Sequence, residues 1–167
     1  MDIAKRANFL FGPTADERDE FRVSMVIVAP SGKCLALKRS PNKKTGGGTW
    51  GGPGGHIDPL ENFAIAAVRE AFEETGITVT NPRFLGCQIV DGKKYVTFAG
   101  STNAEHTPQL DAEHTAYKWV KPDNWPQKIF PGFAPLLKEA KVLAIIKEAA
   151  SVFKKPATHS APAYAHV

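Results

Sequence analysis

The chain has 167 residues and a mass of 18.1 kDa, a size that predicts one domain with a sizeable core and short extensions. Its formal net charge of +4 favours anionic partners, but no basic run exceeds two residues, so the charge pattern does not indicate a nucleic-acid footprint. No apolar stretch approaches the ~18 residues of a membrane span and the N-terminus lacks a signal-peptide core, so we expect a soluble, cytoplasmic protein without a membrane partner.

The first part of the chain predicts a hairpin and a glycine-rich loop. Residues 1–20 are a charged lead-in, which we treat as an N-terminal extension without an assigned function. Residues 21–29 are rich in Val, Ile and Met and predict a buried strand, followed after a turn by a second strand at 34–39. Seven of the fourteen glycines then fall between positions 46 and 55. This density either lets a ligand approach the backbone closely or simply makes the loop flexible.

A helix is predicted over residues 60–75, because Pro59 suits its first turn and Gly76 suits the position just past its end. At about 100° per residue, Glu70, Glu73 and Glu74 share one face of this helix. The opposite face is the predicted core face, and it carries the apolar side chains Ala64, Ile65, Val68, Ala71 and Phe72.

The acidic face of this helix predicts a cation site. Neighbouring carboxylates on a helix repel each other by roughly 0.2–0.5 kcal/mol per pair, and no Lys or Arg lies between them on that face. One turn earlier, Ala66 and Ala67 are short enough to leave room for hydrated ions. Clustered hard oxygen ligands suit Mg²⁺, with Mn²⁺ as the second choice. The alternative is a solvated acidic face, which is what most Glu runs are.

Three further strands are predicted after the helix. They lie at 77–79, 84–90 and 95–99, and the pair Asp91-Gly92 would form the hairpin turn between the last two. A polar loop at 102–112 leads to another strand at 116–120.

The C-terminal part predicts a second helix. Residues 134–153 have helical periodicity, which indicates a long amphipathic helix that closes the domain. We expect the Pro/Ala/His tail at 155–167 to be flexible, with His159 and His166 solvated. Two helices that flank a mixed β-sheet give an α/β/α sandwich of the α+β class, with the domain spanning residues 21–154.

Cys34 and Cys87 stand alone in strand-like segments, and we expect both to be buried and reduced.

The residues around the first helix match a known signature. Each of the seven fixed positions of the Nudix box is matched over residues 55–77, by Gly55, Glu61 and the run from Arg69 to Ile77. With average usage of about 6% per residue type, a chance match is on the order of 10⁻⁸ per starting position. The chain therefore resembles the MutT-like Nudix hydrolases over about residues 21–153. The likeness implies the α/β/α sandwich fold. One mild departure is Ala71, where larger aliphatic residues are commoner.

The resemblance also implies roles for the acidic helix. Its metal ligands would be Glu70, Glu73 and Glu74 together with the backbone carbonyl of Gly54. Arg69 would hold a glutamate carboxylate in position. The reaction would be substitution at phosphorus, in which a cation makes a water more acidic and this water attacks a diphosphate bridge.

A further acid is expected from a loop after the sheet. Glu113 lies six residues before Trp119, where some relatives place an extra metal ligand or base, although it could be a plain surface glutamate. Glu105 is the competing candidate, and Glu61 is expected to act as a brace. Glu70 or Glu113 would accept the proton of the attacking water, and both remain open.

The substrate is expected to be a nucleotide. Lys38, Arg39, Lys43 and Lys44 could meet phosphate oxygens or be ordinary solvated side chains. Near the end of the domain, Phe130 and Pro131 match a base-pocket segment of relatives that cleave nucleoside triphosphates.

The aromatic residues limit the choice of base. Phe133 and Gly132 stand where those relatives have an acid pair, so stacking of a base is plausible and selective recognition of an oxidised purine is not supported. Tyr95 lies where dinucleoside polyphosphate hydrolases carry a tyrosine, although a lone strand Tyr is more often core. Gly92 replaces the proline that ADP-ribose hydrolases tend to carry.

The first choice is therefore a Mg²⁺-dependent pyrophosphohydrolase that converts a nucleoside triphosphate to a monophosphate and pyrophosphate. The alternatives are cleavage of a dinucleoside polyphosphate or of capped RNA, and a non-catalytic nucleotide-sensing module. The oligomeric state is left open.

Overall fold

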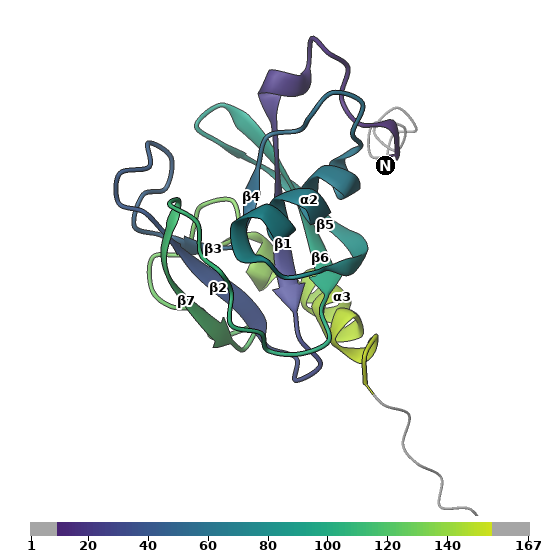
Figure 1. Ribbon diagram of the computed structural model, residues 1–167, viewed down its shortest axis with the longest axis vertical. Helices are drawn as coiled ribbons and strands as arrows, with labels where there is room; N and C mark the ends of the chain where they lie inside the picture. The colour runs from purple at the N-terminus through teal and green to yellow at the C-terminus, as the bar shows by residue number, and fades with distance from the viewer. Residues whose placement is uncertain (1–9, 155–167) are drawn as a thin grey trace, which may run out of the picture.

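The computed structural model describes residues 10–154 (Figure 1). In chain order the strands are β1 (Phe21–Val28), β2 (Cys34–Arg39), β3 (Trp50–Gly51), β4 (Gly54–Gly55), β5 (Thr80–Val90), β6 (Lys93–Ser101) and β7 (His114–Val120). The α-helices among the labelled elements are α2 (Phe63–Thr75) and α3 (Ala140–Ser151), and two short 3₁₀ turns lie at Arg18–Glu20 and Leu136–Lys138. No helix in the described part of the chain is long and apolar enough to cross a bilayer.

The strands form one mixed sheet in the order β3-β2-β1-β6-β5, with β4 paired to β1 and β7 paired to β2. Strands β1 and β6 are parallel, whereas the neighbouring pairs are antiparallel. Asp91 and Gly92 both have positive φ, at 47° and 74°, and this confirms the predicted hairpin turn between β5 and β6.

Strand β1 supplies both layers of the core. Its Met25 and Ile27 pack in the cluster that includes α2, whereas Val26 and Val28 pack in the cluster that includes α3. The two helices therefore cover opposite faces of the sheet, as Figure 1 shows, and the predicted α/β/α sandwich is confirmed. A strand covered on both faces reads as a continuous apolar run, which is why residues 21–29 could be recognised.

Strands β1 and β2 pair only at their shared end, where Val28 faces Cys34. Beyond that point the glycine-rich segment lies between them, since Gly51 pairs with Leu37 of β2 and Gly54 pairs with Ser24 of β1. A Cβ atom on Gly54 would lie 2.1 Å from the carbonyl oxygen of Val23, so this close approach requires glycine. The splayed strands thus bring a glycine backbone to the start of the segment that leads into α2.

Helix α2 ends as predicted but begins three residues later. Gly76 has φ 70° and its N–H donates to the Phe72 carbonyl at 2.7 Å, which is the expected C-terminal cap. Leu60 has φ 68° and cannot belong to the helix. The N-cap is Asn62, whose side chain accepts from the Ile65 N–H at 2.8 Å.

The predicted core face of α2 is correct in part: Ala71 is buried, and Ala64 and Val68 pack against the same core cluster, but Ile65 and Phe72 do not. Ile65 and Phe72 are each 55% exposed, whereas Ala66, Ala67 and Ala71 are fully buried against the sheet. Alanines let the helix backbone lie close to the strands, so the face of α2 that packs against the sheet is the face that carries the alanines. Ala66 and Ala67 are therefore core residues and do not frame a space for ions.

Three other expectations are corrected. The segment at 77–79 is not a strand, since β5 begins at Thr80. The long C-terminal helix is interrupted at Glu139, whose extended backbone (φ −84°, ψ 124°) separates a 3₁₀ turn from α3. Cys34 is buried, but Cys87, which lies in the edge strand β5, is exposed.

The terminal predictions lie outside the described residues. These include the whole tail at 155–167, with His159 and His166, and the first nine residues of the N-terminal extension. The domain boundaries accordingly stay predictions.

Candidate functional site

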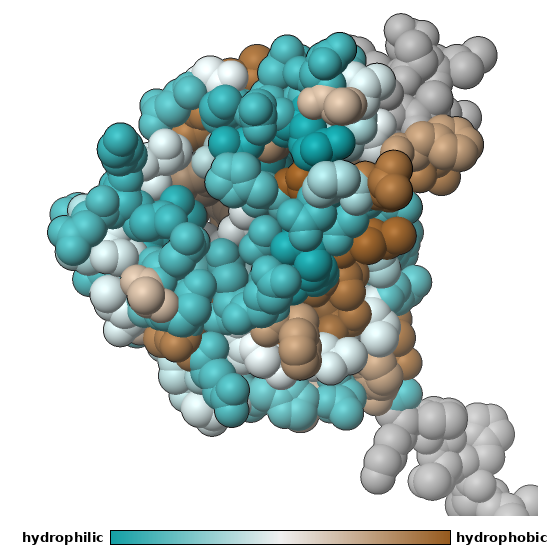
Figure 2. Space-filling view, turned by 45° about the horizontal axis from the view of Figure 1, so that its top comes forward, coloured by the Kyte–Doolittle hydropathy of each residue, from teal (hydrophilic) through white to brown (hydrophobic). Residues whose placement is uncertain are grey.

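A cavity of about 590 Å³ opens where β1 and β2 diverge. The glycine segment at 51–55 and the side chains of Glu70, Glu74 and Glu113 line one part of it. Basic and aromatic side chains line the rest of the cavity, and they include Arg22, Arg39, Lys43, Lys44, His56, Tyr95, Phe130 and Phe133. The face of the molecule in Figure 2 is largely hydrophilic and is hollowed near its centre, with apolar residues gathered along one side.

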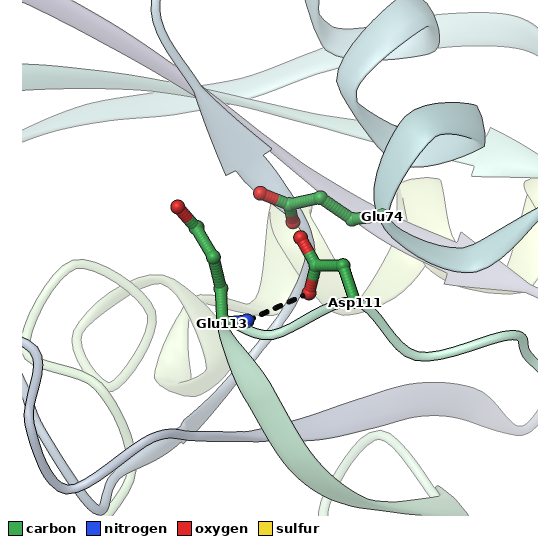
Figure 3. A group of neighbouring side chains, drawn as sticks. All are labelled: Glu74, Asp111 and Glu113. Atoms are coloured by element: carbon green, nitrogen blue, oxygen red, sulfur yellow. Dashed lines mark hydrogen bonds between the residues drawn. The ribbon is translucent and has the colours of Figure 1, made fainter.

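Three carboxylates from two distant segments meet at this cavity. One oxygen each of Glu74, Asp111 and Glu113 lie within 4.8 Å of one another. Figure 3 shows Glu74 reaching from the end of α2 toward Asp111 and Glu113, which come from the segment that enters β7. Glu74 is 5% exposed and also accepts from the Gly54 N–H at 3.0 Å.

Glu70 lies one turn before Glu74 and is pressed against Gly55. A Cβ atom on Gly55 would stand 2.6 Å from Glu70 Oε1, so only glycine leaves the carboxylate where it is. Both groups line the cavity.

The Arg69 guanidinium donates hydrogen bonds to several carboxylates around the start and middle of α2. Its Nε and Nη2 donate to the two oxygens of Glu61 at 2.7 and 2.9 Å, in a bidentate pair. Its Nη1 donates to Glu70 and to Glu73, each at 3.1 Å. Nη2 also donates to the backbone carbonyl of His56 at 3.0 Å. One guanidinium thus joins the loop before α2 to the acidic side of the helix.

Burial changes the pKa values of the carboxyl groups at the site, because it disfavours the charged form. Burial raises the pKa of Glu74 to about 9, and the nearby Asp111, Glu113 and Glu70 carboxylates act in the same direction. Burial also raises the pKa of Glu70. Burial alone would raise the pKa of Glu113 too, but the Lys43 ammonium at 2.8 Å holds it below its ordinary value.

These donors fit a hard divalent cation. Carboxylate oxygens from separate segments converge on one point of a cavity, and bringing such like charges together favours a cation among them. Glu73 lies farther out, because its side chain is 56% exposed and is bound by Arg69.

The comparison with known proteins agrees with this geometry. The model of the NUDIX domain family matches residues 19–140. The chain belongs to the NUDIX family. A MutT-like protein of Streptomyces ambofaciens is 30% identical over 122 residues, which are 71% of this chain and 74% of that protein. The motif-based assignment is thereby confirmed.

Solved structures of similar proteins have the same fold. A MutT NUDIX hydrolase from Burkholderia pseudomallei matches with a TM-score of 0.61 and 27% identity, over 72% of this chain and 97% of that one. The E. coli ORF135 protein matches with a TM-score of 0.58 and 29% identity, over 74% and 89% of the two chains. Family and fold together support a Nudix pyrophosphohydrolase.

Some of the predicted site residues of this NUDIX chain lie together and others do not. Arg39, Lys43 and Lys44 line the cavity, but Lys38 does not, since it alternates with Arg39 across β2. Glu105 pairs with Lys33 at 3.7 Å and lies outside the cavity lining, so it no longer competes with Glu113.

Three aromatic residues line the cavity, and two of them are almost fully buried. Phe130 and Phe133 are only 3% and 2% exposed. The Arg39 guanidinium lies 5.1 Å from the centre of the Phe130 ring, and the Tyr95 ring packs edge-on at 5.2 Å. A base could therefore reach Tyr95 and Arg39 more easily than the two phenylalanine faces.

Three residues near the site were missed by sequence reasoning. Arg22 lies in a strand that reads as core, yet it lines the cavity. Asp111 falls in a polar loop that was given no role, although the pattern Asp111-Ala-Glu113 places two acids close together. His114 follows them and is 5% exposed. Which loop residues turn inward depends on the path of the loop, and a single sequence does not carry that information.

Replacing Gly55 by Ala should impair the site without unfolding the protein. The new methyl group would push the Glu70 carboxylate away, and a misplacement of about 1 Å can cost ~10²-fold in rate. We expect kcat/KM to fall by roughly that factor while the thermal unfolding midpoint stays within a few degrees of wild type. Unchanged turnover in G55A would show that the position of Glu70 is not important.

Proposed function

We propose that this protein is a Mg²⁺-dependent hydrolase that cleaves a nucleoside triphosphate to a nucleoside monophosphate and pyrophosphate. The observation that carries the proposal is the shared cavity, which is lined by acidic, basic and aromatic side chains. Each part suits one part of such a substrate: a cation site, a polyphosphate and a base.

The residues that would hold Mg²⁺ are Glu70, Glu74 and Glu113 together with the carbonyl of Gly54, and Glu73 would lie at the outer edge. Mn²⁺ suits the same oxygen donors. When bound, the cation would make a water more acidic and offset charge on the phosphates. The protein holds these acids in place through two hydrogen bonds: the Gly54 N–H donates to Glu74, and the Arg69 guanidinium donates to Glu70.

The basic residues of the cavity would bind the polyphosphate. Arg22, Arg39, Lys43 and Lys44 line the same cavity as the acids, and charge-assisted hydrogen bonds to phosphate are about twice as strong as neutral ones. Lys43 is bound to Glu113 at 2.8 Å, so an incoming phosphate would compete with this carboxylate for the ammonium.

Glu70 is the better candidate to accept a proton from the attacking water. Arg69 holds its Oε1, whereas Glu113 is already paired with Lys43. Burial raises the pKa of Glu70, which makes it the stronger base, and the pKa of Glu113 is lowered.

A second candidate substrate is a dinucleoside polyphosphate or capped RNA. Tyr95 favours it, because this tyrosine lines the cavity and is only partly buried, although it also packs against the core. Its ring could stack on a second base.

A panel of nucleotides with Mg²⁺ tests these functions against each other. Release of pyrophosphate from nucleoside triphosphates supports the first, and release of a mononucleotide from dinucleoside polyphosphates or capped RNA supports the second. Tight nucleotide binding without hydrolysis would favour a sensing module and would contradict both.

The role of Glu113 can be isolated with a matched pair of variants. We expect Glu113→Gln to lower kcat by ~10²-fold, because it removes a cation ligand and leaves Lys43 without its partner. Glu105→Gln is the control, since Glu105 makes a surface ion pair with Lys33 outside the cavity lining and this variant should behave as wild type. Equal activities of the two variants would show that Glu113 has no role in the reaction.

A further inference from the structure

His114 lies between the acids of the two segments. Its Nδ1 is 3.0 Å from Asp111 Oδ1, and its Nε2 is 3.9 Å from Glu74 Oε2. The ring is almost completely enclosed, and its buried Nε2 has no hydrogen-bond partner within residues 10–154. The imidazole therefore bridges the loop before β7 and the end of α2.

The contact with Asp111 fixes the orientation of the ring. An ionised carboxylate only accepts hydrogen bonds, so Nδ1 carries the proton and donates to Asp111. Nε2 is then directed toward Glu74, whose Oε2 accepts on its other side from the Gly54 N–H at 3.0 Å. The Glu74 carboxylate is thus confined between a backbone donor on β4 and the imidazole at the start of β7.

The same oxygen of Asp111 also determines the position of Glu113. Asp111 Oδ1 accepts from the Glu113 backbone N–H at 3.1 Å, as Figure 3 shows by its dashed line, and it accepts from the imidazole as well. A buried ring nitrogen without a partner lowers stability, and an apolar side chain of similar volume would avoid that loss. Packing alone therefore gives no reason for a histidine here.

We propose that His114, held by Asp111, is a positioning residue that fixes Glu74 and Glu113 relative to each other for a divalent cation. This inference rests on the proposed function. His114 acts through its neighbours, because it is absent from the cavity lining and so does not reach the substrate. Groups that orient metal ligands typically change metal affinity by ~10–100-fold when they are replaced.

Titration of Mn²⁺ alone into the substrate-free protein tests the inference. We expect His114→Leu, which keeps an apolar side chain in the space, to bind Mn²⁺ ~10–100-fold more weakly than wild type. His114→Asn should bind at least ~3-fold more tightly than the leucine variant, since its amide can still donate to Asp111. His106→Leu is the control, because the ring of this exposed histidine of the preceding loop bonds Asn103 and its loss should leave the affinity unchanged.

Two further measurements separate positioning from a purely structural role. Thermal unfolding in EDTA reports stability without metal, and steady-state kinetics at saturating Mg²⁺ should give a lower kcat with little change in KM for the leucine variant. A lower unfolding midpoint with wild-type Mn²⁺ affinity would overturn the inference and leave the proposed function intact. So would an asparagine variant no better than leucine. If wild type itself binds no Mn²⁺, the proposed function fails and the inference fails with it.

Discussion

Glu74→Gln should abolish turnover and leave the fold intact. The substitution removes the charge of the most buried acid of the site at nearly constant volume, and the amide oxygen can still accept from the Gly54 N–H. Loss of a cation ligand that supplies several kcal/mol corresponds to a decrease in kcat of ~10³-fold or more. Pyrophosphate release measured with Mg²⁺, beside a circular dichroism spectrum, checks both parts. Activity within a few-fold of wild type would refute the metal assignment.

The same variant should change the pH dependence of stability. Burial raises the pKa of Glu74 from its ordinary value of 4.5 to about 9, so the folded protein favours the neutral acid. The stabilising contribution of the protonated group is complete below pH 4.5 and is lost as the pH rises toward 9. In EDTA, wild type should lose stability across this window relative to E74Q. Parallel curves of unfolding midpoint against pH would contradict this.

Arg69→Met should be the most damaging change to stability in the site. It leaves Glu61, Glu70 and Glu73 without their shared cation, and these acids are drawn together on one side of α2. We expect a loss of about 2–3 kcal/mol in the free energy of unfolding, less than for a fully buried pair because Arg69 is 23% exposed. We also expect kcat to fall by at least ~10-fold as Glu70 loses its orientation.

Two matched variants sharpen this result. Arg69→Lys restores the charge without the planar fork and should recover less than half of the lost stability. Arg83→Met removes an exposed ion pair with Glu148 and should cost under about 1 kcal/mol by urea unfolding. Comparable losses for R69M and R83M would mean that the Arg69 network has no special importance.

The parts that could be predicted from the sequence are encoded locally. Gly76 ends α2 because a left-handed cap suits glycine, and Asp91-Gly92 turns a hairpin for the same reason. The spacing of Glu70 and Glu74 on one side of a helix follows from 3.6 residues per turn. The family motif is short and contiguous, so it too was visible before any folding had to be considered.

The parts that were missed depend on tertiary packing. Ile65 and Phe72 are apolar but exposed, because the neighbouring alanines allow a closer contact with the sheet than larger side chains would. The position of Asp111 follows from the path of a loop. Cys87 is exposed although Leu85 of the same strand is buried, and which residues of a strand are covered depends on how the whole sheet is packed.

The assembly of acids from α2 and from the loop before β7 also bears on the folding equilibrium. These side chains become neighbours only when the strands between them have formed, so an unfolded chain has no comparable place for an ion. A ligand that binds the native state alone adds about 2.7 kcal/mol to its stability at a hundredfold excess over Kd. The melting temperature of this protein would then follow the free Mg²⁺ concentration of its surroundings.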